Sequence, residues 1–265
     1  MYEAHFGLER RPFGETACAS AYLALPSRDA ALRRIRYGLE QGLGPTLLYG
    51  GTGLGKTLAA NRLATDMAAP TVHLTFPSMP TADLLAHLAG EFGGTAVETS
   101  SMSAALRRLR QALAEYASKG RRPLLIVDEA QLIQDASVFE SLRLLLNFQS
   151  GGVPDLSLLL VGTGEVVLQL PVGLQDRLTA RSLLPPLTQS ESAAYIAGKL
   201  AAAGAREPLF TPEALADIHQ EALGVPRRLN HIADLALLIA YAEGTPRGDP
   251  RIISVAPREL SAQPL

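Results

Sequence analysis

Hydrophobic residues in the first part of the chain form short continuous runs, separated by longer amphipathic stretches. The runs predict buried strands at residues 46–50, 71–76, 124–127 and 156–162, and a shorter one at 182–184. Apart from residues 71–76, TVHLTF, the runs lack the alternation of apolar and polar residues that a half-exposed sheet would show. The pattern therefore predicts an α/β fold, in which helices flank a parallel sheet on both faces.

Between these runs, apolar residues recur at helical spacing. Helices are expected at residues 29–41, 58–67, 81–92, 103–119 and 137–148. Residues 149–155, QSGGVPD, are rich in turn-forming residues and are expected to form a loop.

After Pro185 and Pro186 the pattern becomes entirely helical. Helix starts are predicted at a capping box formed by Thr188 and Glu191, at Thr211 followed by Pro212, and at Pro226. The chain is thus expected to divide into an N-terminal lead-in segment with a helix packed on the core (1–45), an α/β domain (46–186), a small all-helical domain (187–245) and a loosely held tail (246–265).

Composition narrows the class of protein. Of the 265 residues, 47% are hydrophobic and the net charge is -2, which indicates a globular chain without a general attraction to nucleic acid. The single cysteine, Cys18, suits a reducing compartment. No apolar run approaches the ~20 residues of a membrane span, and the first residues do not resemble a signal peptide. We therefore expect a cytoplasmic protein.

The stretch GGTGLGKT at residues 50–57 follows the first predicted strand and matches the phosphate-binding loop of P-loop NTPases. In such a loop, glycines let successive N–H groups converge on phosphate oxygens at the N-terminus of the next helix. Lys56 is expected to reach the β- and γ-phosphates of ATP, and the Thr57 hydroxyl to bind Mg²⁺. The predicted nucleotide-binding residues are Gly50, Gly51, Thr52, Gly53, Leu54, Gly55, Lys56, Thr57 and Leu58.

Two adjacent acids, Asp128 and Glu129, end the buried run in LLIVDEAQ (124–131). Considered alone, they could be a solvated strand end or a helix N-cap pair. Beside a phosphate-binding loop, Asp128 is expected to hold Mg²⁺, and Glu129 to orient or deprotonate the attacking water. A second acid next to the metal ligand favours ATP hydrolysis over phosphoryl transfer to a small molecule.

Further motifs follow in order: LVGTGE (160–165), LQDRLTAR (174–181) and GVPRRLN (224–230). Together with VDEAQ (127–131) and the opening FGLERRPF (6–13), they give a chain that resembles the AAA+ ATPases of the general secretion pathway protein A (ExeA-like) group. That group is related to the ATPases that regulate bacterial DNA transposition. The resemblance extends to about Glu243 and implies an AAA+ fold with a helical lid.

The resemblance also implies roles for four more residues. Thr163 would be the polar sensor that helps to place the water, although the group often has glutamine there. Arg177 and Arg181 lie where the group carries the arginine finger that acts on a neighbouring subunit; Arg177 is favoured, and the choice between them stays open. Arg227 would be the second sensor, which contacts the γ-phosphate from the lid. The alternative for the arginines is a solvated surface.

A finger acting on a neighbour implies a homo-oligomer, either a ring or a filament, which would use ATP hydrolysis to assemble or remodel a protein or protein–DNA complex. One alternative is a secretion or pilus assembly ATPase with a protein partner. Another is a transposition-type regulator that binds double-stranded DNA, which fits two local basic clusters: Arg33, Arg34 and Arg36, and Arg107, Arg108 and Arg110. A nucleotide-dependent switch with little turnover and a small-molecule kinase are weaker alternatives. His73 is expected to be a core residue, and Pro12 and Phe13 to pack near adenine.

Overall fold

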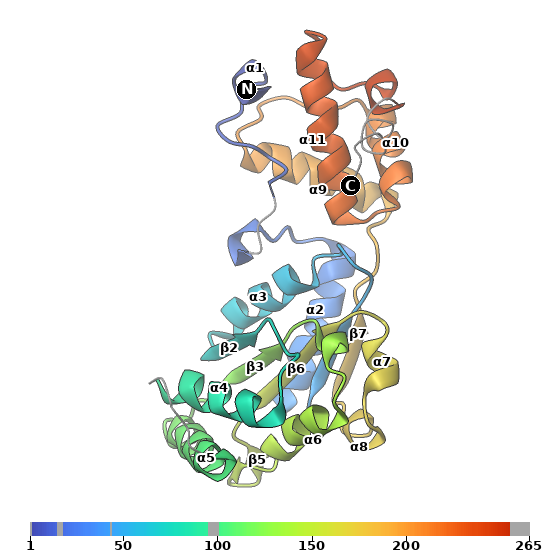
Figure 1. Cartoon of the computed structure of the whole chain (residues 1–265). Coiled ribbons are helices and arrows are strands. Elements are labelled where there is room, and N and C mark those ends of the chain that lie inside the picture. The colour runs from blue at the N-terminus through green and yellow to red at the C-terminus, as the bar shows by residue number, and fades with distance from the viewer. Residues whose placement is uncertain (1, 15–17, 43, 95–100, 255–265) are drawn as a thin grey trace.

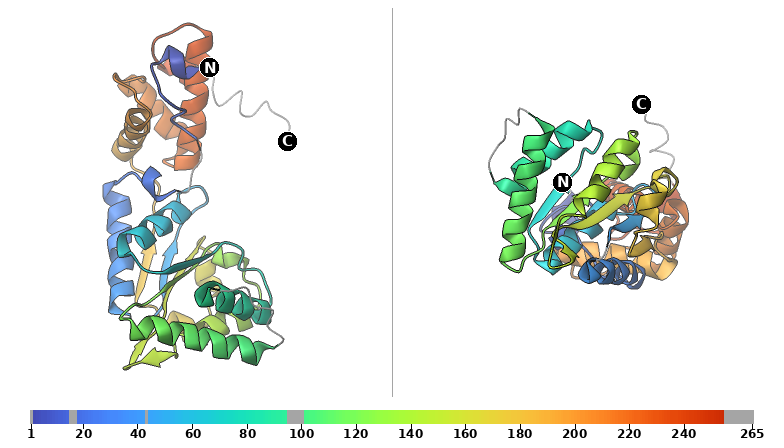
Figure 2. Two further views of the ribbon diagram at one scale, coloured as in Figure 1. Left: turned by 90° about the vertical axis from the view of Figure 1, so that its left-hand side faces the viewer. Right: turned by 90° about the horizontal axis from the view of Figure 1, so that it is seen from below.

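The computed structural model describes residues 2–14, 18–42, 44–94 and 101–254. These residues form two parts, a sheet covered by helices and, at one end of it, a smaller cluster of helices (Figure 1). A turned view shows that the molecule is elongated along the line that joins the two parts (Figure 2).

Five parallel strands form the main sheet, in the order β2-β3-β6-β1-β7. Their bounds are β1 Thr46–Tyr49, β2 Thr71–Leu74, β3 Leu124–Val127, β6 Ser157–Gly162 and β7 Ala180–Leu183. Because all five run in one direction, the residues that follow β1, β3 and β6 meet at the same edge of the sheet. The predicted α/β fold is confirmed, and the phosphate loop and the acid pair lie at that edge.

Helices cover both faces of the sheet, and the three central strands, β3, β6 and β1, send alternate residues into two separate cores. Leu124 and Ile126 of β3 belong to one core, and Leu125 and Val127 to the other; all four are fully buried. This division explains why the strand is apolar without interruption. The first core includes residues of α2 (Pro26–Gln41) and α3 (Lys56–Met67), and the second includes residues of α4 (Thr81–Gly93), α5 (Met102–Ser118) and α6 (Ala136–Leu145).

Short elements connect the larger ones. They are the 3₁₀ turns η1 (Ala19–Ala21) and η2 (Ala130–Leu132), and the helices α7 (Val166–Gln169) and α8 (Val172–Gln175). The residues expected to form a loop at 149–155 instead include an antiparallel hairpin, β4 (Gln149–Ser150) with β5 (Val153–Pro154). Gly151 and Gly152 both have positive φ, so this glycine pair makes a tight turn that the composition alone did not distinguish from a loop.

The smaller part has its own core, built from α9 (Gln189–Ala202), α10 (Pro212–Ala222) and α11 (Pro226–Ala242). The N-terminal segment, including α1 (Tyr2–His5), packs here. Phe6, Leu8 and Phe13 are buried in this helical core, whereas α2 packs on the sheet. The expectation that the whole lead-in packs on the α/β core is therefore wrong for its first residues, because their aromatic side chains fill the space beside α11.

The segment after α11 was predicted to be a loosely held tail, and this is wrong for residues 246–254. The Gly248 N–H donates to the Leu209 carbonyl at 2.8 Å, and the side chains of Ile252 and Ile253 are buried in the helical core. The prediction followed the proline and arginine content and gave too little weight to this isoleucine pair. Residues 255–265 lie outside the described residues.

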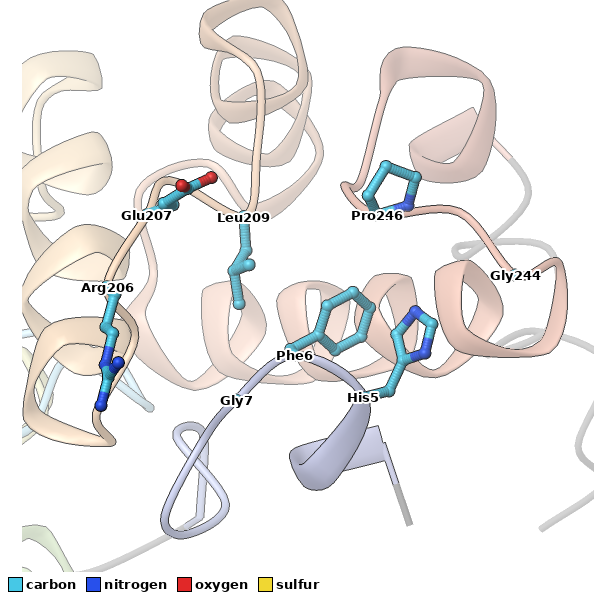
Figure 3. Close-up of a pocket in the computed structure, with 8 residues that line it drawn as sticks. All are labelled: His5, Phe6, Gly7, Arg206, Glu207, Leu209, Gly244 and Pro246. Atoms are coloured by element: carbon cyan, nitrogen blue, oxygen red, sulfur yellow. The ribbon is translucent and has the colours of Figure 1, made fainter.

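A pocket lies between the N-terminal segment and the loops of the helical part (Figure 3). It is lined by His5, Phe6, Gly7, Arg206, Glu207, Leu209, Gly244 and Pro246, none of which belongs to the phosphate loop or the acid pair. Within the described ranges, no helix combines the length and the apolar character that crossing a bilayer requires.

Candidate functional site

The phosphate loop connects β1 to α3, and residues 56–58 form the first turn of that helix. Gly53 and Gly55 have φ values of +78° and +83°, which residues with a side chain rarely adopt. The N–H groups in the first turn of a helix have no partner within the helix and carry its positive dipole end. The loop is therefore shaped to receive an anion at the start of α3.

Lys56 is buried and lies within the loop, where its Nζ donates to the Gly51 carbonyl at 3.1 Å. Burial lowers the pKa of Lys56, while the negative charges of Glu129 and Asp128 raise it and Arg227 lowers it further; the net direction is down. The lysine thus lies within electrostatic range of both acids and of the lid arginine. These four charged residues come from three separate stretches of the sequence and meet at one place.

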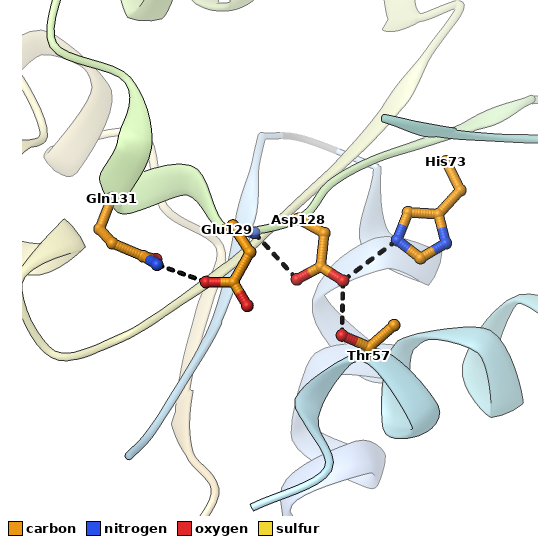
Figure 4. Close-up of polar contacts among 5 residues, drawn as sticks. All are labelled: Thr57, His73, Asp128, Glu129 and Gln131. Carbon is orange, nitrogen blue, oxygen red and sulfur yellow. Dashed lines mark hydrogen bonds and ion pairs between the residues drawn. The ribbon is translucent and has the colours of Figure 1, made fainter. Parts of the chain in front are cut away.

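Asp128 follows β3 and is held on both carboxylate oxygens (Figure 4). Its Oδ2 accepts from the Thr57 hydroxyl at 2.7 Å and lies 3.2 Å from His73 Nε2, while Oδ1 accepts from the Glu129 N–H at 2.9 Å. Burial alone would raise the pKa of Asp128, but these hydrogen bonds outweigh burial and lower it. Asp128 is therefore an ionised carboxylate in contact with the first turn of α3.

Glu129 is one of the few described residues other than glycine with positive φ, at φ 49° and ψ 40°. For a residue with a Cβ this left-handed conformation costs roughly 1–2 kcal/mol. The turn takes the chain out of β3, and the Glu129 carboxylate accepts from the Gln131 side chain (Figure 4). Strain at a residue beside a binding loop is typical of functional sites.

The oxygen atoms beside the loop suit Mg²⁺. Thr57 Oγ1 and Asp128 Oδ2 lie 2.7 Å apart and are the hard oxygen ligands that this cation binds, usually together with substrate phosphates and water. Within the described part of the chain, no group of three or more His, Cys, Asp or Glu could hold a metal ion without such help. A metal at this site would therefore depend on the nucleotide for most of its ligands.

Thr163 comes directly after β6, which lies beside β3 in the sheet. Its N–H donates to Gln131 Oε1 at 3.0 Å, and its buried Oγ1 has no hydrogen-bond partner within the described residues. An unpaired buried hydroxyl needs an explanation. A water or a phosphate oxygen at this edge of the sheet would satisfy it.

Arg227 lies in the first turn of α11 (Pro226–Ala242), beside the phosphate loop. Its N–H donates to the Gly53 carbonyl at 3.2 Å, and a Cβ placed on Gly53 would lie 3.1 Å from the Arg227 Cβ. Gly53 thus permits a close backbone contact between the helical part and the loop. The contact brings a cation from the helical part to the region where phosphates would bind.

Arg177 and Arg181 lie apart from the charged residues that meet beside the phosphate loop. Arg177 precedes β7, and the residues around it lie at the amino edge of the sheet, because the Thr179 N–H donates to the Pro45 carbonyl just before β1. Its guanidinium is exposed and donates to Asn147 Oδ1 at 3.2 Å. Arg181 lies within β7 with its guanidinium 4.9 Å from the centre of the Tyr49 ring.

Three residues beside the predicted site were missed by sequence reasoning. His73 was predicted to be core, but it is half-buried and contacts Asp128, a pairing that becomes visible only once β2 is known to lie beside β3. Gln131 stands in the quoted motif without an assigned role. The buried Arg28 donates to the Leu54 carbonyl in the phosphate loop at 2.7 Å, and its position at the start of α2 gave no signal.

Comparisons with known proteins agree with this geometry. Residues 39–170 match a family described as AAA domain. The chain is 34% identical over 268 aligned positions to general secretion pathway protein A of Aeromonas hydrophila; the match covers 98% of this chain and 49% of that protein, so the chain spans about half the length of its relative.

Two solved structures share the fold at low sequence identity. The Aeropyrum pernix ORC2 protein, solved in ADPNP-ADP complexes, has a TM-score of 0.70 and 19% identity, covering 97% of this chain and 75% of that one. The Aeropyrum pernix ORC1 protein, solved in complex with DNA, has a TM-score of 0.65 and 18% identity, covering 91% and 67%.

Proposed function

Since the chain belongs to the AAA domain family, we propose that it hydrolyses ATP with Mg²⁺ at sites between its own copies. The energy of the cycle would assemble or remodel a protein or protein–DNA complex. The observation that carries the proposal is the 2.7 Å hydrogen bond from Thr57 to Asp128, which joins the phosphate loop to the acid pair.

The residues at the site divide the work of hydrolysis. The N–H groups of residues 50–58 and Lys56 bind the phosphates, and Arg227 approaches them from the helical part. When bound, Mg²⁺ neutralises charge on the phosphates, and Thr57 and Asp128 would hold it. Glu129 orients the attacking water and takes its proton, and Thr163 contributes a hydroxyl at the same edge.

Arg177 is proposed as the arginine finger, and its place in the sheet supports an action on a neighbouring copy. It lies at the amino edge, whereas its own phosphate loop follows the carboxyl end of β1. The length of the four-residue strand β1, about 13 Å, therefore separates the edge that carries Arg177 from the phosphate loop of the same copy. Arg181 lies in the edge strand β7 beside Tyr49 and is the less suitable candidate, because the Tyr49 ring already contacts its guanidinium.

Two uses of the ATPase cycle are proposed. The match to general secretion pathway protein A favours a partner in a secretion or assembly apparatus. A DNA-binding role of the transposition-regulator type is the second candidate, and its support is the fold shared with a protein solved in complex with DNA. A nucleotide-dependent switch with little turnover would leave the acid Glu129 without a task.

The test is ATP turnover by the purified chain over a range of protein concentrations, with and without double-stranded DNA. The proposal predicts that turnover per chain rises with concentration, because the site needs a neighbour. A further rise with DNA would favour the DNA-binding role, and its absence the protein-partner role. Turnover that does not change with concentration would contradict a site between copies.

The matched control is Glu129→Gln, which keeps the shape of the side chain and removes the base. Turnover should fall by roughly 10²- to 10⁴-fold, while a fluorescent ATP analogue should bind as it does to the wild-type chain. Unchanged turnover in this variant would remove Glu129 from the proposed mechanism.

A further inference from the structure

Gln131 lies in η2, the turn that follows Glu129, and its side-chain amide contacts two groups at once. Its Nε2 donates to the Glu129 carboxylate (Figure 4), and its Oε1 accepts from the Thr163 N–H at 3.0 Å. The side chain therefore bridges the residue after β3 and the residue after β6, at the edge of the sheet that carries the phosphate loop.

The orientation of this amide follows from the chemistry of its neighbours. A backbone N–H can only donate, so the amide oxygen must face Thr163. The NH₂ group must then face Glu129, where an ionised carboxylate can only accept. Both ends of the amide are matched, and the flipped amide would place a donor against a donor and an acceptor against an acceptor.

The bridge also needs a glycine at position 162. A Cβ placed on Gly162 would lie 2.7 Å from Gln131 Oε1, closer than such atoms approach in proteins. Any other residue at the end of β6 would push the amide away from the Thr163 N–H. The glycine in VGTGE and the glutamine in DEAQ are therefore parts of one contact, although 31 positions separate Gln131 and Gly162 in the sequence.

We propose that Gln131 is a positioning residue for ATP hydrolysis: it holds one oxygen of the Glu129 carboxylate and ties it to the end of β6, so that the other oxygen is presented to the attacking water. This inference rests on the proposed ATPase function. A free glutamate side chain would sample several rotamers, whereas a carboxylate held at one oxygen keeps the reacting geometry. The same strand end supplies the unpaired Thr163 hydroxyl, so base and sensor would be fixed relative to each other.

Two variants separate this role from packing. Gln131→Glu keeps the shape of the side chain and an oxygen facing the Thr163 N–H, but it replaces the donor to Glu129 with a second carboxylate oxygen. Gln131→Met keeps the length and removes both hydrogen bonds. For each variant we would measure kcat and KM for ATP, the affinity for a fluorescent ATP analogue, and the thermal unfolding midpoint.

The proposal predicts that both variants lose about 10- to 100-fold in kcat, the cost of a misplaced reacting group, while KM, nucleotide affinity and the unfolding midpoint stay close to wild type. Full turnover in Gln131→Glu would overturn it, because the bridge to β6 would then suffice without the donor. Full turnover in Gln131→Met with loss in Gln131→Glu would also overturn it, since only the added charge would matter.

Loss of nucleotide binding or a large fall in the unfolding midpoint would assign Gln131 a structural role and overturn the proposal. If the wild-type chain itself showed no ATP turnover, the proposed ATPase function would fail, and the role of Gln131 with it. An active wild-type chain beside an equally active Gln131→Glu variant would remove only the role of Gln131.

Discussion

At the scale of single residues, the site depends on hydrogen bonds that fix the two acids after β3. Asp128 Oδ2 is shared between the Thr57 hydroxyl and the His73 ring, so the oxygen that would face a cation is held from two sides. Groups that orient a metal ligand in this way affect the affinity for the metal without touching it.

Removing the imidazole in His73→Ala should therefore weaken Mg²⁺ binding. We expect the Mg²⁺ concentration for half-maximal ATP turnover to rise about 10-fold, because Asp128 loses one of its orienting contacts. The measurement is a Mg²⁺ titration of turnover at saturating ATP. His87→Ala is the matched control, since His87 is an exposed residue of α4. An equal Mg²⁺ requirement in both variants would show that His73 only fills space.

At the scale of elements, the start of α9 joins the two parts of the molecule. Thr188 and Glu191 form the capping box predicted from the sequence. The Glu191 carboxylate also accepts from the Ser27 N–H at 2.8 Å, near the start of α2. Glu191 thus accepts hydrogen bonds from backbone N–H groups at the starts of both α2 and α9. The stabilities of these two helices, which lie in different parts of the chain, are therefore coupled.

Glu191→Gln should lower the free energy of unfolding at neutral pH by about 1 kcal/mol, the typical contribution of a helix cap, which corresponds to roughly 2–4 °C in the unfolding midpoint. An amide cannot accept at both of its ends as a carboxylate does. Thermal unfolding of both chains, followed by circular dichroism, measures the difference.

The difference in stability between the wild-type chain and the Glu191→Gln variant should also depend on pH. Burial would raise the pKa of Glu191, but the hydrogen bonds from Ser27 and Thr188 outweigh burial and lower it in the folded state. The stabilisation is therefore fully present above the unfolded pKa of about 4.3 and is lost as the pH falls through the lowered folded pKa. The two midpoints should converge in that acidic range; a difference that persists there would contradict the ionic origin of the effect.

At the scale of the whole molecule, the first residues of the chain are part of the helical core. Tyr2 and Arg11 both donate to Asp234 of α11, and Phe13 is buried against the helices. Phe13 was expected to pack near adenine, but its side chain already packs in the helical core. The N-terminal segment therefore links the helical part to α2 and the sheet.

Phe13→Ala should destabilise the fold by about 3–5 kcal/mol, the usual cost of removing a buried phenylalanine. Chemical denaturation compared with Phe76→Ala, whose ring is 65% exposed, isolates the effect of burial. At a temperature where both variants are folded, a nucleotide-binding assay should give equal affinities. Weaker binding by Phe13→Ala alone would support the contact with adenine.

The sequence predicted the sheet, and it placed the glycine-rich loop between a strand and a helix, because both are local signals: mostly continuous apolar runs, and glycines at fixed spacing before a lysine. The site around them was less accessible, because its contacts cross between strands. His73 reaches Asp128 only through the neighbouring position of β2 and β3, and Gln131 reaches Thr163 only because β6 lies beside β3. The packing of residues 2–13 and of Ile252 and Ile253 on the helical part likewise depends on contacts between distant parts of the chain.

In the proposed oligomer, one copy supplies Glu129 and a neighbouring copy supplies Arg177 to the same ATP molecule. The Glu129→Gln variant keeps Arg177 but lacks the base, and the Arg177→Ala variant keeps the acid pair but lacks the finger. Each variant alone should therefore lose most turnover, roughly 10³-fold or more for the arginine. Arg181→Ala serves as the matched arginine control.

The most direct measurement is ATP turnover of the two inactive variants mixed in equal amounts. Turnover should reappear on mixing, because some pairs of copies then place an intact Arg177 beside an intact Glu129. If the mixture stays as inactive as the separate variants, or if Arg177→Ala alone turns over ATP like the wild-type chain, a site shared between copies through Arg177 is contradicted.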